Sequence, residues 1–253
     1  MFNYYFCTKT VKGYLKDKNH KVLDYGCGSG EIISALKDCG IDAYGCEIFY
    51  EASKAREKVP KSFLKNGTIK PMESIYKIPF PEDSFDIIIS NMVLEHVKDL
   101  DATLKEFKRV LTKEGLIISL FPSKESWRES HCGLWFLHWF PPKSKLRYYY
   151  ALLLRIFGFG YHKEGKSISE WCIHKCNWLD NWTYYRSKKD IKIIFNKYFK
   201  YSKNIEKLYL KNKFPMAKYL LDLIPTKLIN IFINKFATLA FISSSNRKRI
   251  LEL

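Results

Sequence analysis

Short apolar runs alternate with amphipathic segments along the first 120 residues of the chain. Apolar runs bounded by turns predict buried parallel strands, and apolar positions three or four apart predict helices. The predicted strands cover residues 21–25, 42–48, 85–90 and 116–121, with a weakly marked strand within 63–74. The predicted helices cover residues 31–39, 50–58 and 99–111. This alternation is typical of βαβ units in a doubly wound α/β sheet, which binds ligands at the carboxyl ends of its strands.

Local signals mark the ends of the first two of these helices. Ser29 stands at the expected N-cap of the first helix, where a hydroxyl can accept a hydrogen bond from the first turn. Gly40 stands at its expected C-terminus, because glycine tolerates the left-handed backbone of a helix end. Pro60 limits the second helix, since proline cannot continue one.

The alternation stops after residue 121 and resumes with a helix over 188–199. Two further strands are predicted over 203–211 and 235–245, with an amphipathic region over 216–233 between them. The chain is therefore predicted to be one α/β domain over residues 1–253, built on a seven-stranded, mostly parallel sheet. Its parts are a ligand-binding half over 1–121, an insertion after the fifth strand over 122–187, and a segment over 188–253 that completes the sheet.

Charge and tryptophan are unevenly distributed between the two halves. The net charge is +17, but residues 1–120 contain 18 Lys and Arg against 17 Asp and Glu, whereas residues 121–253 contain 25 against 9. All six tryptophans lie within residues 127–182. The insertion is therefore an aromatic and basic segment, and we expect it to have a different task from the first half.

Cysteine content and hydropathy limit where the protein works. Seven cysteines without a CxxC pair argue against a disulfide framework, so we expect reduced thiols. Cys172, His174 and Cys176 lack a second ligand pair at zinc-finger spacing, so we predict no metal site and expect this segment to pack among tryptophans. No apolar stretch reaches the length of a spanning helix and no signal peptide is recognisable, which predicts a cytoplasmic protein.

A glycine-rich loop follows the first predicted strand. Gly26, Gly28 and Gly30 alternate as GxGxG, unlike the GxGxxG that holds a pyrophosphate at a helix N-terminus. Asp24 ends the strand before the loop, where a carboxylate repels phosphate but can hold an ammonium group. Glu47 ends the next strand, the position from which an acid accepts ribose hydroxyls. This pattern predicts a site for an adenosyl group with a cationic tail.

The segments VLDYGCGSG, GCEI and IPFPEDSFDIIISNMVLEHVKD resemble the successive motifs of class I S-adenosylmethionine-dependent methyltransferases. The resemblance covers roughly residues 20–121, and the third segment is characteristic of the branch that methylates small molecules, lipids and sugars. It implies a Rossmann-like fold with S-adenosylmethionine as cofactor, and an acceptor-binding cap formed by the insertion.

The resemblance also implies roles for single residues around the cofactor. Gly26, Gly28 and Gly30 would form the wall of the pocket, Asp24 would contact the methionine end, Glu47 the ribose and Ile48 the adenine, and Asn91 and Met92 would lie beside the methionine portion and the reacting methyl. An acidic residue that the family uses for the adenine amino group is replaced by Ser74, so either Glu73 or Ser74 is expected to make that contact. His96 is expected to hold the helix after the fourth strand rather than to act as a base.

The insertion supplies the candidates for acceptor chemistry. His131 and His138 are the predicted general bases for a neutral hydroxyl, because histidine titrates in a range suited to proton transfer. An acceptor that is already anionic needs no base, and cationic side chains would then position it. The candidates for this role are Arg128, Lys143, Lys145 and Arg147.

Three acceptor classes fit these observations. The leading hypothesis is O-methylation of a small anionic or sugar acceptor in surface polysaccharide biosynthesis, such as a nucleotide-activated sugar, a glycan, or a phosphoryl or phosphoramidate modification. A lipid or quinone methyltransferase, peripheral to the inner membrane, is the second, because residues 147–157 and 214–234 suit a membrane interface. An RNA methyltransferase is the third, although the basic residues are spread out and the fourth strand ends in SNMV rather than an NPPY-type motif.

Overall fold

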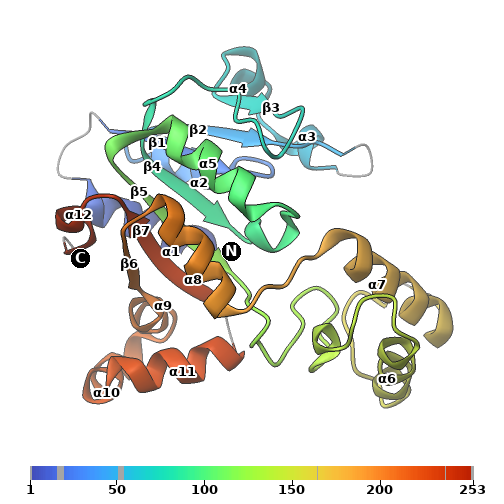
Figure 1. Cartoon of the computed structure of the whole chain (residues 1–253). Coiled ribbons are helices and arrows are strands. Elements are labelled where there is room, and N and C mark those ends of the chain that lie inside the picture. Colours follow the sequence, from blue (N-terminus) through green and yellow to red (C-terminus); the bar gives the residue numbers. More distant parts are fainter. Residues whose placement is uncertain (1, 16–19, 51–53, 164, 237, 252–253) are drawn as a thin grey trace.

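The sheet has the predicted mixed seven-stranded architecture (Figure 1). The computed structural model describes residues 2–15, 20–50, 54–163, 165–236 and 238–251. The strand order is β3-β2-β1-β4-β5-β7-β6, and β7 is antiparallel to both of its neighbours. The strands are β1 Lys21–Tyr25, β2 Asp42–Glu47, β3 Ile69–Pro71, β4 Phe85–Asn91, β5 Leu111–Phe121, β6 Tyr201–Asn204 and β7 Leu239–Ser244. The order reverses beside β1, whose parallel partners are β2 and β4, and this creates the crevice where doubly wound sheets bind ligands.

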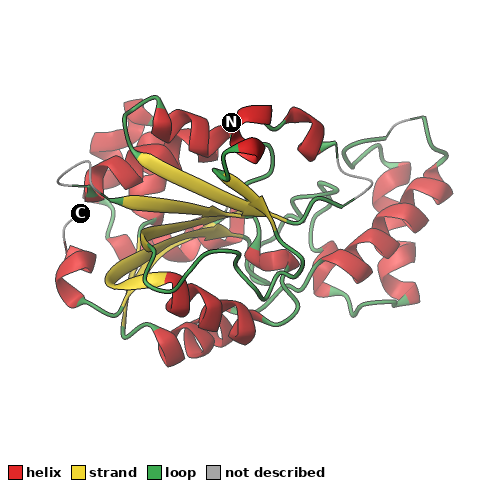
Figure 2. Ribbon diagram, turned by 90° about the horizontal axis from the view of Figure 1, so that it is seen from above, coloured by secondary structure: helices red, strands yellow, loops and turns green. Residues whose placement is uncertain are grey.

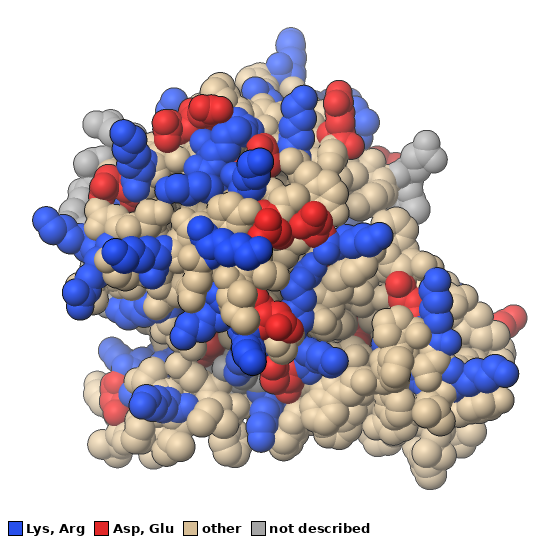
Figure 3. All heavy atoms as spheres, in the orientation of Figure 1, with Lys and Arg blue, Asp and Glu red and all other residues tan. Residues whose placement is uncertain are grey.

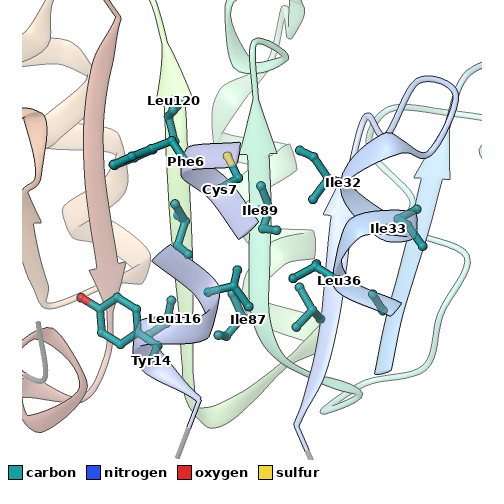
Figure 4. Close-up of a cluster of buried hydrophobic side chains, with 14 of the residues drawn as sticks. Phe6, Cys7, Tyr14, Ile32, Ile33, Leu36, Ile87, Ile89, Leu116 and Leu120 are labelled. Atoms are coloured by element: carbon teal, nitrogen blue, oxygen red, sulfur yellow. The ribbon is translucent and has the colours of Figure 1, made fainter. Parts of the chain in front are cut away.

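Helices cover both faces of the sheet (Figure 2). On one face, α1 (Phe2–Tyr14) and α2 (Glu31–Lys37) pack against β4 and β5. Figure 4 shows side chains of these two helices over the isoleucines and leucines of both strands. On the other face, α5 (Leu100–Val110) and α8 (Lys188–Tyr198) bury an apolar stripe at helical spacing. The α5 stripe consists of Leu100, Leu104, Phe107 and Val110.

The remaining helices lie at the edges of this core. Between β2 and β3 are α3 (Ala55–Lys58) and α4 (Lys61–Lys65), and a short 3-10 turn, η1 (Leu94–His96), follows β4. The C-terminal part contains α9 (Glu206–Lys213), η3 (Pro215–Ala217), α10 (Lys218–Leu223), α11 (Thr226–Phe236) and α12 (Arg247–Leu251). The predicted amphipathic region is therefore helical, in two pieces separated around Pro225.

Residues 122–187 leave the sheet and form a cap (Figure 1), which contains η2 (Leu137–Trp139), α6 (Lys145–Ile156) and α7 (Ile168–Trp182). Both α6 and α7 begin at serine N-caps whose hydroxyls accept from the first turn. The cap has an apolar cluster of its own, in which Cys172 and Cys176 pack near Trp171 as expected. Figure 1 shows the cap beyond the carboxyl end of β4.

Three smaller local predictions differ from the structure. The N-cap of α2 is Gly30 in the left-handed conformation, and the Ser29 hydroxyl instead donates to Glu31 at 2.9 Å. The predicted helix over 50–58 is helical only over 55–58; residue 50 is not helical, and residues 51–53 lie outside the described residues. Strand β7 is shorter than predicted, with residues 235 and 236 still in α11.

The largest error concerns residues 203–211, which were predicted to be one strand. Strand β6 ends at Asn204, and residues 206–213 form α9. The physical reason is Tyr209, whose ring packs edge-on against Phe2 and Phe6 with centroids 5.1 and 5.0 Å apart. Helix α1, which the sequence analysis did not predict, creates this partner surface, and α9 turns its buried side toward it.

No helix in the described ranges combines the length and the apolar character needed to cross a membrane.

Candidate active site

The glycine-rich loop adopts a backbone that favours glycine at all three predicted positions. Gly26, Gly28 and Gly30 have φ angles of 73°, 54° and 88°, in the left-handed region. A Cβ at Gly26 would lie 2.4 Å from the side chain of Val93, and one at Gly30 would lie 2.7 Å from Ile69. A Cβ at Gly28 would meet no protein atom within 4 Å, because Gly28 borders a cavity. Gly28 therefore keeps space open for a ligand, whereas the other two glycines are needed for packing.

The predicted methionine-end residues meet in one cavity of about 540 Å³ at the carboxyl ends of β1 and β4. The predicted residues that line it are Asp24, Gly26, Gly28, Asn91 and Met92. The structure thus brings together residues separated by almost seventy positions in the sequence. It places them where a doubly wound sheet binds its ligand.

Two helices that the sequence analysis did not assign to the site close this cavity. Helix α1 contributes Phe2, Asn3 and Tyr4, and α9 contributes Tyr209 and Lys213. The Tyr209 hydroxyl donates to Asn3 Oδ1 at 2.8 Å, and Asn3 Nδ2 donates to the Oδ1 of Asn91 at 3.1 Å. Buried α1 residues recur at helical spacing, a signal in the sequence that predicts the helix but not what it covers.

Asp24 is buried at the bottom of the cavity, with 3% of its surface exposed. Burial raises its pKa to about 8, with further contributions from the charges of Glu47 and Glu31. Ionising a buried carboxyl group is costly when the group stands alone, but it becomes favourable when a cation pairs with the carboxylate. The position therefore suits the ammonium group of an amino-acid tail.

Glu47 lies at the end of β2 and is held by two backbone amides. Gly28 N–H donates to its Oε2 at 2.7 Å and Ile48 N–H donates to its Oε1 at 2.8 Å. Burial raises the pKa of Glu47, and these two hydrogen bonds partly oppose the increase. Each carboxylate oxygen has a second lone pair, so both ribose hydroxyls can still donate to it.

A second cavity of about 200 Å³ continues past Glu47 and has mostly apolar walls. Ile48, predicted to flank the adenine, lines it together with Met72, Ile75 and Val97. Met92, with a left-handed φ of 58°, borders both cavities and lies between them. A flat aromatic base suits such a slot.

The predicted adenine-amino contacts do not line this second cavity. Glu73 is exposed, and the Ser74 hydroxyl accepts a hydrogen bond from the backbone of Tyr76 at 3.2 Å. Met72 and Ile75, on either side of them, face the cavity instead. Where an acidic contact to the adenine amino group was expected, the second cavity therefore has an apolar wall.

A buried carboxylate organises the start of the cap. Glu129 accepts hydrogen bonds from His131 Nδ1 at 2.6 Å and from the Tyr185 hydroxyl at 2.6 Å, and also from the backbone of His131 and Cys132. Burial raises the pKa of Glu129, but these hydrogen bonds and the His131 charge outweigh it and lower the pKa to about 2. Glu129 is therefore an ionised anchor that orients His131. The sequence analysis missed both Glu129 and Tyr185.

His96 connects this group to the cofactor cavities. Its ring lines the second cavity and lies edge-on to the His131 ring, with centroids 5.0 Å apart. Its Nδ1 is 2.6 Å from the Trp182 carbonyl, a contact that ties the turn after β4 to the cap. Burial lowers the pKa of His96, and the His131 charge adds to this against the effect of the Trp182 carbonyl. These contacts agree with the expected holding role.

The other predicted base, His138, lies in a separate cap cavity of about 490 Å³. Its buried ring packs on Tyr185 with centroids 4.6 Å apart, and burial lowers its pKa. Tyr184, Phe140 and Trp139 add aromatic walls. The cations that line this cavity are Lys124, Arg147 and Arg186.

The predicted substrate-binding cations are mostly used by the cap itself. Arg147 lines the cap cavity, but it forms a buried ion pair with Asp180. Arg128 donates to the Gly133 carbonyl and lies over the Tyr161 ring, 4.7 Å from its centroid. Lys143 and Lys145 are exposed and do not line this cavity. Lys124, absent from the sequence-based candidates, is an exposed cation at its edge.

Glu95, His96 and His131 form a cluster whose ligand-type atoms lie within 4.8 Å of one another. Glu95 is fully buried and its oxygens accept no hydrogen bond from the described residues; burial raises its pKa to about 8. Its Oε1 is 4.0 Å from His96 Nε2, whereas two ligands of one tetrahedral zinc ion lie about 3.4 Å apart. We therefore interpret the cluster as a polar network, and the absence of a metal stays a prediction.

Comparisons with known proteins agree with this geometry. Residues 23–119 match the family described as a methyltransferase domain. An uncharacterized methyltransferase of Schizosaccharomyces pombe is 34% identical over 119 residues, which are 43% of this chain and 41% of that protein. The ubiquinone biosynthesis O-methyltransferase of Pelagibacter ubique is 33% identical over 105 residues, 40% of this chain and 41% of that protein. The chain thus spans about two fifths of the length of these curated relatives.

Among solved structures, an S-adenosylmethionine-dependent methyltransferase from Mesorhizobium loti has the same fold, with a TM-score of 0.52 and 13% identity over 93% of this chain and 95% of that chain. Residues 23–119 thus match a methyltransferase domain, and the cofactor that this match and the fold support is S-adenosylmethionine. The family match ends before the cap, so it carries no information on the residues that bind the methyl acceptor.

Proposed function

We propose that this protein transfers a methyl group from S-adenosylmethionine to a hydroxyl of a small acceptor that combines a sugar ring with an anionic group. The observation that carries the proposal is the hydrogen-bonded group of Glu129, His131 and Tyr185, which adjoins His96 at the wall of the cofactor cavity. A neutral hydroxyl needs a proton acceptor when it becomes a nucleophile, and this group provides one.

The residues divide the work between binding and proton transfer. S-adenosylmethionine supplies an activated methyl group on a sulfonium, so the main requirement is an acceptor held in line and shielded from water. Asp24 would hold the ammonium group of the methyl donor and Glu47 its ribose, and Met92 lies between the two cavities. In its neutral form, His131 would take the proton of the acceptor hydroxyl as that oxygen becomes the nucleophile. Ionised Glu129 stabilises the resulting imidazolium.

The acceptor class follows from the cap cavity. Aromatic side chains suit the apolar face of a sugar ring, and Lys124 supplies positive charge at the edge. A nucleotide-activated sugar, a glycan, or a phosphoryl or phosphoramidate compound of surface polysaccharide biosynthesis has this chemistry. His131 is hydrogen-bonded to Glu129, whereas His138 only packs on Tyr185, which favours His131 as the base and His138 as part of the acceptor wall.

The test is methyl transfer from a labelled donor to separate pools of nucleotide sugars, phosphorylated glycans, lipids and RNA. We expect label in the sugar-containing anionic pools. Glu129→Gln should reduce it strongly with cofactor binding preserved, and Lys143→Ala, outside the cap cavity, should leave it unchanged. Label found only in RNA or only in lipid would overturn the proposal.

A further inference from the structure

Two separate parts of the molecule expose stripes of large apolar side chains. On α10 the stripe begins just before the helix and consists of Met216, Tyr219, Leu220 and Leu223, at spacings of three and four residues. Met216 is fully exposed, and Tyr219 and Leu223 are each 81% exposed. Leu228, Ile231 and Phe232 continue it on α11. Soluble proteins seldom leave such continuous apolar surface uncovered unless it binds something.

The cap carries the second stripe. Leu146, Tyr149, Leu153, Ile156 and Phe157 are exposed along α6, again at helical spacing, while Ala151 of the same helix is buried in the cap cluster. In Figure 1, α6 and the α10–α11 pair lie at opposite ends of the lower border of the molecule. In the same orientation, Figure 3 shows this border as mostly uncharged, with Lys and Arg side chains beside and above it.

Both stripes lie in strongly basic segments. Residues 206–236 contain six lysines against two acids, and residues 143–166 contain six Lys and Arg against one acid. Of the two acids in the first segment, Glu206 is buried and Asp222 is paired with Lys211. Exposed apolar side chains with flanking lysines are the combination that anchors helices in the interface of an anionic bilayer.

This charge also argues against the other occupants of such a surface. A second copy of the chain would bring the same basic segments together, and like charges across an interface oppose association. Nucleic acid would be attracted by the lysines, but most members of the stripes are aliphatic and offer no ring on which bases could stack.

We propose that the lower face formed by α6, α10 and α11 docks on an anionic phospholipid bilayer. The apolar stripes enter the interface while the lysines contact the lipid headgroups. The cap and the cofactor-binding half then sit on the membrane together, with neither of them spanning it. This proposal stands independently of the acceptor, because it rests on surface residues outside the active site.

The experiment is flotation of the full chain with vesicles of phosphatidylcholine alone or mixed with phosphatidylglycerol. We expect flotation with the anionic vesicles and little with phosphatidylcholine alone. The double variants Tyr219→Ser with Leu223→Ser, and Leu153→Ser with Phe157→Ser, should each weaken binding roughly tenfold or more. Ile193→Ser on α8, which removes one exposed apolar side chain away from this face, is the control.

Two results would overturn the proposal. One is unchanged flotation in both double variants, which would mean that the stripes do not enter the bilayer. The other is absence of vesicle binding combined with a dimer in analytical ultracentrifugation that the same variants dissociate, which would assign the face to a second copy. Circular dichroism and cofactor binding, measured on every variant, identify a loss that comes from misfolding.

Discussion

Asn3 donates a hydrogen bond to Asn91, which joins the first turn of the N-terminal helix to the end of the central strand β4. The contact spans 88 positions of sequence and lies at the wall of the methionine-end cavity. The Tyr209 hydroxyl of α9 donates a further hydrogen bond to Asn3. The cofactor site therefore depends on segments well outside the residues that carry the recognisable methyltransferase motifs.

Gly28→Val should abolish cofactor binding while leaving the fold intact. A Cβ at this position meets no protein atom within 4 Å and points into the cavity, so we expect a loss of affinity of about a hundredfold or more, measured by calorimetry with S-adenosylhomocysteine. Gly158→Val is the matched control, because Gly158 also has a positive φ with open space around it and lies in the cap. Both variants should lose about 1–2 kcal/mol of stability from backbone strain. Equal cofactor affinity in the two would contradict the assignment of the cavity.

Cofactor affinity should rise with pH up to about pH 8. The pKa of Asp24 is raised to about 8 by burial, so the carboxyl is largely protonated below that value, whereas an ammonium group binds its ionised form. The association constant should therefore increase by up to about tenfold per pH unit while protons are released on binding. Calorimetry in buffers of different ionisation enthalpy measures that release. Asp24→Asn should bind weakly at every pH without this dependence.

The same residue predicts a change in stability in the absence of cofactor. The folded pKa of Asp24 lies above its ordinary value of 3.8, so its neutral form favours folding and this advantage is lost as pH rises through about 8. Relative to wild type, Asp24→Asn should become progressively more stable between about pH 4 and 8. Denaturant unfolding of both proteins across this range checks the sign. A difference that stays constant with pH would show that Asp24 is ionised in the folded protein.

His131→Ala should reduce turnover by about 10² to 10⁴ with cofactor binding preserved, because it removes the proposed proton acceptor. Glu129→Gln should also lower turnover, because it removes the carboxylate that stabilises the imidazolium. Tyr185→Phe keeps the ring and should cost less. Near-normal turnover in these variants with a flat pH profile would instead indicate an anionic acceptor, positioned without base catalysis.

Chelation of divalent metals should leave turnover unchanged. The separation of Glu95 and His96 exceeds that of two ligands on one tetrahedral ion, and the nearby His131 is already oriented by Glu129. Activity measured after dialysis against a strong chelator, with and without added zinc, tests this. Loss of activity that zinc restores would establish Glu95, His96 and His131 as metal ligands.

The cofactor half was predictable because its signals are local. Glycine spacing, short apolar strands and acids at strand ends all report on a few neighbouring residues, and Gly28 and Glu47, predicted for one pocket, are hydrogen-bonded to each other. The strand predicted over 203–211 was wrong because the pattern alone could not reveal the partner of Tyr209 on α1. Glu129 was missed for a similar reason: its role depends on Tyr185, 56 positions later in the chain.

Arg186 connects the cap cavity with the segment that borders the adenine-side cavity. Its guanidinium donates to the carbonyls of Val97 and Lys98, in the segment that follows β4, at 2.6 and 2.7 Å. Val97 also lines the adenine-side cavity, and Arg186 lines the cap cavity. A change in that segment on binding of the methyl donor would therefore also act on Arg186 at the wall of the cap cavity. Coupling between two binding sites is reciprocal. If the acceptor binds more tightly to the donor-loaded protein, the donor must bind more tightly to the acceptor-loaded protein by the same factor.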